Sequence, residues 1–117
     1  MLLDELRSLL ISRPAATEET PFGPDALVYK VQGKMFALVG WNALPLRLSL
    51  KCAPAHALAL RAEFTAVEPG YHLDKRHWIT LTLDGSLPPP LLHALIDESY
   101  RLVVKKLPKF KQHDLLG

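Results

Sequence analysis

Residues 46–51 read Leu-Arg-Leu-Ser-Leu-Lys. Leucine alternates with a polar residue along this stretch, which is the period-2 pattern of a β-strand with one buried face and one face in water. Residues 77–83 repeat the pattern, with apolar side chains at positions 79, 81 and 83. Both segments therefore predict strands of a sheet that buries its aliphatic face.

Three further strands are predicted on either side of these two. Residues 27–31 alternate, residues 35–41 are almost continuously apolar, and Gln32-Gly33 between them fits a tight hairpin turn. A nearly continuous apolar strand indicates that both of its faces are covered. A short additional strand is predicted near Val67. Residues 17–24 are interpreted as a loop in which Phe22 is expected to be buried.

The helices are predicted from the spacing of apolar residues and from prolines. Residues 2–10 place leucines on one helical face, and this helix should end before Pro14. The second helix spans residues 54–64, where Ala53 replaces a capping side chain at a cost of about 1 kcal/mol. Ser86 is expected to start the last helix and Pro108 to end it. Lys109 and Lys111 lie beyond that proline and are expected to be mobile.

The predicted order is therefore α-β-β-β-α-β-α, with the short extra strand after the second helix. The strands are short and joined mostly by turns, which favours a mostly antiparallel sheet with helices packed on one face. This is an α+β fold, a two-layer sandwich. The length of 117 residues is that of one domain, so we expect residues 1–117 to form a single domain.

Composition excludes several classes of protein. A formal net charge of +2 is too small for a histone-like, wholly basic nucleic-acid protein. The single Cys52 excludes an intramolecular disulfide and a multi-thiolate metal site. No apolar run approaches the ~20 residues of a membrane helix, and the N-terminus lacks the features of a signal peptide. We expect a cytoplasmic protein, a monomer, with no membrane partner.

Sequence motifs give no support for catalysis. The chain has no G-x-S-x-G, no phosphate-binding loop and no G-x-G-x-x-G motif. The five histidines do not match the spacing of a zinc site. Cys52 is interpreted as a small core residue. We therefore predict no catalytic residue, no metal and no cofactor.

Two regions are candidates for binding. The polar face of the predicted sheet carries cations, hydroxyls and one tryptophan: Lys30, Arg47, Ser49, Lys51, Trp78, Thr80 and Thr82. The segment from Gly70 to Trp78 adds Tyr71, Lys75 and Arg76. A basic surface with exposed aromatic side chains can hold a phosphate backbone and stack a base. An exposed sheet face needs polar side chains in any case, so a solvated face without a ligand explains the same pattern.

Several motifs resemble those of the MmcQ/YjbR family, in order and over essentially the whole chain. They are Pro21-Phe22-Gly23-Pro24-Asp25-Ala26-Leu27-Val28-Tyr29-Lys30-Val31, Gly33-Lys34-Met35-Phe36-Ala37-Leu38, Leu48-Ser49-Leu50-Lys51-Cys52, Pro69-Gly70-Tyr71-His72-Leu73, Lys75-Arg76-His77-Trp78, Asp84-Gly85-Ser86-Leu87-Pro88 and Ser99-Tyr100-Arg101-Leu102-Val103-Val104. The resemblance implies a CyaY-like fold and a DNA-binding role in a double-wing arrangement. Asp74 departs from the family's usual Asn and adds a negative charge beside two cations.

Three hypotheses about function follow. In the first, the protein binds DNA, with phosphates on the cations and a base stacked on an aromatic ring; its residues are Lys30, Arg47, Lys51, Tyr71, Lys75, Arg76 and Trp78. In the second, the same face docks a protein partner, because Trp and Arg suit an interface hot spot equally well. In the third, Lys51, Tyr71, His72 and His77 surround a pocket for a small ligand.

Overall fold

The computed structural model describes residues 1–42 and 44–116. Four helices and six strands follow one another along the chain. Their bounds are α1 (Leu3–Ile11), β1 (Ala16–Glu19), β2 (Ala26–Val31), β3 (Lys34–Gly40), β4 (Arg47–Lys51), α2 (Pro54–Glu63), β5 (Val67–Pro69), β6 (Trp78–Thr82), α3 (Pro89–Val104) and α4 (Lys109–Leu116).

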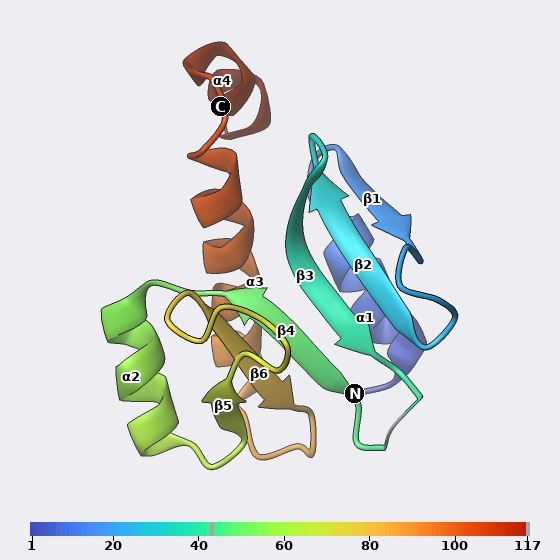
Figure 1. The fold of residues 1–117 in the computed structure, drawn as a ribbon, viewed down its shortest axis with the longest axis vertical. Coiled ribbons are helices and arrows are strands. Elements are labelled where there is room, and N and C mark those ends of the chain that lie inside the picture. Colours follow the sequence, from blue (N-terminus) through green and yellow to red (C-terminus); the bar gives the residue numbers. More distant parts are fainter. Residues whose placement is uncertain (43, 117) are drawn as a thin grey trace.

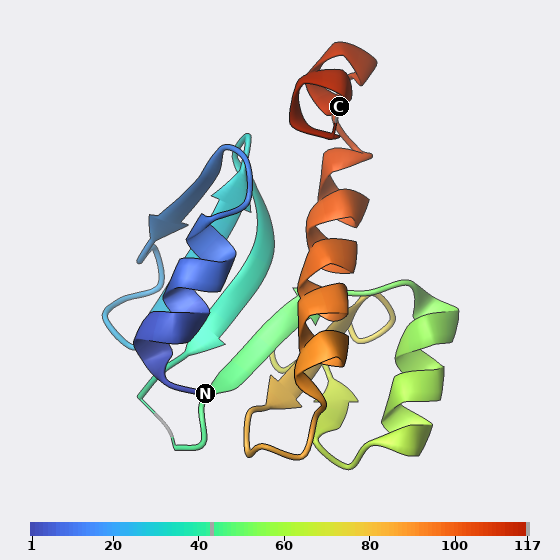
Figure 2. The ribbon, with the colours of Figure 1, turned by 180° about the vertical axis from the view of Figure 1, so that it is seen from behind.

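The six strands form one sheet in the order β1-β2-β3-β4-β6-β5, and every neighbouring pair is antiparallel. In Figure 1 the sheet faces the viewer and α1 and α3 lie behind it; Figure 2 shows the same helices in front. The predicted α+β architecture, with a mostly antiparallel sheet and helices on one face, is confirmed.

Strand register separates the two faces of the sheet. Leu48 pairs with Leu81 and Leu50 with Ile79, and all four side chains are buried in the core beneath the helices. The intervening positions, such as Ser49 and Thr80, belong to the opposite face, which we call the open face. The alternation of residues 46–51 and 77–83 therefore predicts correctly which side chains face the helices.

An irregularity in β3 places one more large side chain in the core. Tyr29 pairs with Ala37, whereas Lys30 pairs with Met35, so Phe36 is the extra residue of a β-bulge. The Phe36 ring is fully buried and packs edge-on against Tyr100 of α3, with ring centroids 5.4 Å apart. The bulge thus anchors β3 to α3.

Beyond this bulge β3 and β4 diverge, as Figure 1 shows. Their pairing ends at Ala37 and Leu50. Ser99 of α3 is fully buried at the fork. Its hydroxyl donates to the Phe36 carbonyl (2.5 Å) and accepts from the Lys51 amide (2.8 Å). One side chain therefore joins two strands where their own hydrogen bonds stop.

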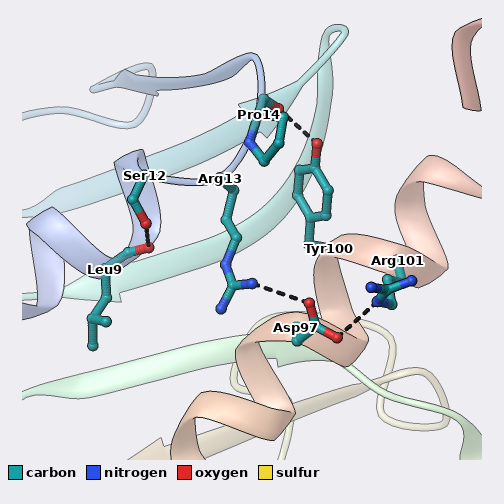
Figure 3. A network of polar contacts seen from close by, with 7 residues as sticks. All are labelled: Leu9, Ser12, Arg13, Pro14, Asp97, Tyr100 and Arg101. Atoms are coloured by element: carbon teal, nitrogen blue, oxygen red, sulfur yellow. Dashed lines mark hydrogen bonds and ion pairs between the residues drawn. The ribbon is translucent and has the colours of Figure 1, made fainter. Parts of the chain in front are cut away.

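Polar contacts also join the end of α1 to α3 (Figure 3). The Arg13 guanidinium donates to Asp97 (3.0 Å), and Arg101 donates to the other oxygen of the same carboxylate (2.8 Å). The Tyr100 hydroxyl donates to the Pro14 carbonyl (2.6 Å). These contacts fix the position of α1 on the back of the sheet relative to the central helix.

Four expectations from the sequence are wrong in detail. Residues 16–19 form the edge strand β1 inside the predicted loop. Phe22 is exposed. Ser86 is no helix cap, because its hydroxyl donates to Asp84 (2.6 Å) and α3 begins at Pro89. Lys109 and Lys111 belong to the helix α4, and Gln112 of this helix donates to the Leu107 carbonyl in the segment that follows α3 (2.7 Å).

The uncapped start predicted for α2 has a partner from elsewhere in the chain. The Glu98 carboxylate of α3 accepts the amide hydrogen of Ala53 (3.2 Å). A distant carboxylate therefore satisfies the amide of the N-cap residue and places negative charge at the start of α2, although position 53 has no side chain to accept from the first turn. Within the described ranges, 1–42 and 44–116, no helix is both long and apolar enough to cross a membrane.

Candidate functional site on the open face of the sheet

The centre of the open face is covered by the segment between β5 and β6. Ser49 and Thr80 are buried, and their hydroxyls are 2.8 Å apart. The Tyr71 amide donates to the Thr80 hydroxyl (2.9 Å). The expectation that these two residues face solvent is therefore wrong, because residues 70–77 fold over them. Figure 1 shows this segment in yellow, in front of β4 and β6.

The backbone of this covering loop approaches β6 very closely at Gly70. A Cβ atom built on Gly70 would lie 2.7 Å from the Cβ of Trp78, and the Gly70 amide donates to the Trp78 carbonyl (2.9 Å). The Lys75 ammonium donates to the Gly70 carbonyl (2.8 Å). Asp74 accepts the amide hydrogen of Arg76 (2.9 Å). Lys75 and Asp74 thus have structural functions inside the loop.

A pocket of about 470 Å³ opens beside the loop. Its walls come from β2, β3, β4, β6, the covering loop and the segment before β2. The lining residues are Phe22, Ala26, Met35, Leu38, Gly40, Asn42, Arg47, Ser49, Tyr71, His72, Leu73 and Thr80. The exposed surface of the lining is mostly apolar, so the pocket combines an apolar interior with a few polar groups, as small-molecule sites do.

Two aromatic rings and one guanidinium lie at the pocket. Phe22 is 71% exposed and Tyr71 is 55% exposed. The Arg47 guanidinium lies 4.8 Å from the centroid of the Tyr71 ring, a cation–π contact. Arg47 also forms an ion pair with Glu68 at 3.5 Å. The structure therefore brings together two of the predicted site residues, Arg47 and Tyr71.

The remaining predicted residues lie apart from the pocket lining. Lys51 and Trp78 are cross-strand partners at the other end of β4 and β6. Lys30 is on β2 and forms an ion pair with Glu19 of β1 (3.3 Å). Arg76 is exposed on the covering loop. In the part of the chain that the structure describes, the side chains of Lys51 and Arg76 have no hydrogen-bond or ion-pair partner.

A smaller hollow of about 330 Å³ lies beside Lys51, towards α3. Its lining also includes His77 from the covering loop and Lys106, two residues after α3. The His77 backbone carbonyl accepts the Cys52 amide hydrogen (2.8 Å). Cationic side chains therefore gather at this end of the sheet.

One group of metal-ligating side chains is found among residues 1–42 and 44–116: Cys52, His56 and Glu98. His56 Nδ1 lies 2.6 Å from one oxygen of Glu98, and Cys52 Sγ donates to the other at 3.4 Å. Burial raises the pKa of the Cys52 thiol to about 12, and the Glu98 charge adds to this effect. Unliganded Cys52 is therefore a neutral thiol near pH 7.

The protein is a small α+β protein in which a loop covers the polar side of an antiparallel sheet, with a pocket beside that loop. A family model described as YjbR matches residues 11–102. The chain therefore belongs to the YjbR family.

Relatives and solved structures agree with this assignment. The chain is 36% identical to the uncharacterized protein YjbR of Escherichia coli K12 over 112 residues, which are 96% of this chain and 95% of that protein. It is 34% identical to the uncharacterized protein YyaQ of Bacillus subtilis, over 65% of this chain and 63% of that protein. The crystal structure of Deinococcus radiodurans DR2400 superposes with a TM-score of 0.90 at 43% identity, over 97% of this chain and 86% of that chain.

Sequence reasoning missed most of the apolar pocket lining. Phe22 is expected from the sequence to be buried in a loop. No sequence motif marks Met35 or Leu38 as a site residue. The signal for them is the nearly continuous apolar run from residue 35 to 41, which indicates a strand covered on both faces. The pocket lies on the second of those faces.

Proposed function

We propose that this protein binds single-stranded nucleic acid on the open face. One unstacked base enters the pocket beside Tyr71 and Phe22. Phosphates further along the strand lie against Lys51 and Arg76. The double-stranded form is a poorer ligand, because its bases are stacked and paired and none is free to enter a pocket.

The observation that carries this proposal is the apolar pocket bordered by exposed aromatic rings and a guanidinium. Bases have apolar faces that stack on aromatic side chains whatever their sequence. The pocket volume of about 470 Å³ is within the range of sites for small planar molecules. Arg47, held over Tyr71, places a cation at the edge of this platform.

The distribution of charge makes the expected affinity modest. Lys30 and Arg47 each face a carboxylate, Glu19 and Glu68, and Lys75 is bound to the loop backbone. Lys51 and Arg76 are therefore the first candidates for phosphate contacts. Two contacts correspond to a slope of about −1.4 in a plot of log affinity against log salt concentration for a single strand.

The test is a fluorescence anisotropy titration with labelled single- and double-stranded oligonucleotides, at low and at physiological salt. The Lys51→Ala/Arg76→Ala variant should weaken binding and flatten the salt dependence, and Tyr71→Ala should weaken binding at every salt concentration. The matched control is Lys109→Ala/Lys111→Ala, which removes the same charge from α4. Lys75 is left unchanged because its removal would disturb the loop.

Two results would contradict the proposal. One is the absence of binding at low salt, where electrostatic attraction is strongest. The other is an equal loss of affinity in the α4 control. That result would mean that binding depends on the net charge of the protein and not on the open face.

A small organic acid is the second candidate ligand, and the same pocket favours it. An apolar body would fill the space between Leu38 and Tyr71, and a carboxylate would pair with Arg47. A fluorescent aromatic carboxylate such as naphthoate serves as the probe. Binding of naphthoate that Arg47→Met abolishes, together with no binding of oligonucleotides, would favour this candidate over nucleic acid.

A further inference from the structure

The side chains of Cys52, His56 and Glu98 meet at the junction of β4, α2 and α3. Cys52 precedes α2, His56 is in its first turn, and Glu98 extends from α3. Their ligand atoms all lie within 4.8 Å of one another. This cluster is separate from the pocket beside Tyr71 and is not used by the proposed nucleic-acid site.

We propose that Cys52, His56 and Glu98 form a zinc-binding site with three protein ligands. The donor set is one sulfur, one imidazole nitrogen and one carboxylate, whose oxygens Oε2 and Oε1 lie next to the sulfur and the nitrogen, respectively. Zinc accepts all three donor types and binds them tetrahedrally. Sulfur argues against magnesium and calcium, which prefer oxygen ligands.

The three ligand atoms lie within 4.8 Å of one another, so tetrahedral coordination requires shifts of about 1 Å. Zinc lies about 2.3 Å from sulfur and about 2.0–2.2 Å from nitrogen and oxygen, so tetrahedral ligand atoms are about 3.2–3.7 Å apart. The Cys52 Sγ and Glu98 Oε2 atoms already satisfy this spacing at 3.4 Å. His56 Nδ1 and Glu98 Oε1, at 2.6 Å, must separate by less than about 1 Å as the metal replaces the proton between them.

A hydrogen bond from the backbone orients one of the ligands. The Ala53 amide donates to Glu98 Oε2 (3.2 Å), which orients the carboxylate as an outer hydrogen bond does in known metal sites. Burial and the Glu98 charge keep the unliganded Cys52 thiol protonated, so the metal ion itself must displace this proton. On binding, the Cys52 thiol releases its proton to solvent, and His56 binds as neutral imidazole through Nδ1.

The site is open on one side. The His56 side chain is 42% exposed and that of Glu98 is 25% exposed, whereas Cys52 is buried. A metal bound here keeps its fourth position for water or an exogenous ligand, as three-ligand zinc sites do. Spacing rules miss this site because Glu98 is far from Cys52 and His56 in the sequence.

Cobalt(II) reports directly on such a site. The reduced protein is titrated with Co²⁺ in the absence of oxygen, and the absorption spectrum is recorded. One equivalent should produce a thiolate-to-cobalt charge-transfer band together with the visible bands of tetrahedral cobalt. One equivalent of Zn²⁺ should then remove both.

Single variants distinguish the loss of a metal ligand from a general loss of folding. His56→Ala changes a half-exposed side chain and should weaken Co²⁺ binding at least about tenfold. Glu98→Gln should weaken binding too, because the amide is a poorer ligand. His93→Ala, an exposed histidine on α3, is the matched control and should bind as the wild type does. Cys52→Ala should abolish the charge-transfer band.

Three results would overturn the proposal. They are the absence of a charge-transfer band in the wild type, a band that survives in Cys52→Ala, and equal affinities in His56→Ala and the wild type. Because His56→Ala leaves the core intact, the test does not depend on the folding of the Cys52 variant.

Discussion

Gly70 shows how one residue controls the architecture of the open face. Its backbone runs against β6 so closely that a methyl group would lie 2.7 Å from the Trp78 Cβ and 3.1 Å from the Trp78 carbonyl oxygen. Backbone atoms cannot move aside as the end of a flexible side chain can. The absence of a side chain at position 70 is therefore what allows the loop to cover Ser49 and Thr80.

We expect Gly70→Ala to lower the free energy of unfolding by about 1–3 kcal/mol, the range for overpacked sites. Urea denaturation followed by tryptophan fluorescence measures the loss. The matched control is Gly40→Ala, where the new Cβ would lie 3.9 Å from its nearest neighbour and the change should stay within about 0.5 kcal/mol. Equal stability of the two variants would contradict the close approach.

Glu18 is a second residue with a predictable effect, through pH. Hydrogen bonds from Arg7 (2.7 and 3.0 Å) hold the pKa of this carboxyl below its usual value of 4.5. The Tyr29 hydroxyl donates to the same carboxylate. A lowered folded-state pKa stabilises the protein above the usual value, and this stabilisation is lost as pH falls through the folded-state pKa.

We expect Glu18→Gln to cost about 1–2 kcal/mol at about pH 7, a modest value because Arg7 is partly in solvent. The difference from the wild type should narrow as pH is lowered from about 5 towards about 3. Urea denaturation at a series of pH values checks this. A difference that stays constant across the series would show that the charge of Glu18 is not the source of its effect.

At the scale of the elements, α3 organises the rest of the fold. Phe36 packs on its Tyr100, Ser99 bridges β3 and β4, and Glu98 accepts the amide hydrogen at the start of α2. Three successive residues of one helix therefore contact three different elements. The fork between β3 and β4 depends on Ser99, the middle residue of the three.

We expect Ser99→Ala to lower the free energy of unfolding by about 2–4 kcal/mol. The change leaves the Phe36 carbonyl and the Lys51 amide without partners in a buried position, and each such group costs about 1–3 kcal/mol. Ser86→Ala, at an exposed serine, is the control and should change stability by less than about 0.5 kcal/mol. Hydrogen exchange of the Lys51 amide should become faster in Ser99→Ala alone.

Elements were predicted from sequence where their pattern is local. The alternation at 46–51 and 77–83 correctly assigns the buried face, because one face of these strands is aliphatic throughout. Strand β1 was missed, since Ala16–Glu19 is too short and polar to show a pattern. The bulge at Phe36 depends on pairing with β2, and no single segment reveals it.

The candidate site was less predictable than the fold for the same reason. Arg47 and Tyr71 were both named, but their contact depends on the path of the covering loop. The burial of Ser49 and Thr80 depends on it too. Phe22 was misplaced because an aromatic residue in a loop is as consistent with a buried anchor as with a pocket wall.

At the scale of the whole molecule, the open face determines whether two copies of the protein associate. We expect the protein to be a monomer in solution, because the Arg47–Glu68 ion pair and the polar lining residues interrupt the apolar area of the open face. Sedimentation equilibrium over a range of concentrations checks this. A dimer that Trp78→Ala dissociates would instead favour the protein-interaction hypothesis.

The two edge strands have a consequence for behaviour at high concentration. The sheet ends in β1, which carries Glu18 and Glu19, and in β5, which is three residues long and ends in Pro69. The charges of β1 hinder the addition of a strand from another molecule. The short length of β5 and the missing amide hydrogen of Pro69 have the same effect. At high concentration the protein should therefore resist fibril formation, even though the four strands between those edges bury many aliphatic side chains.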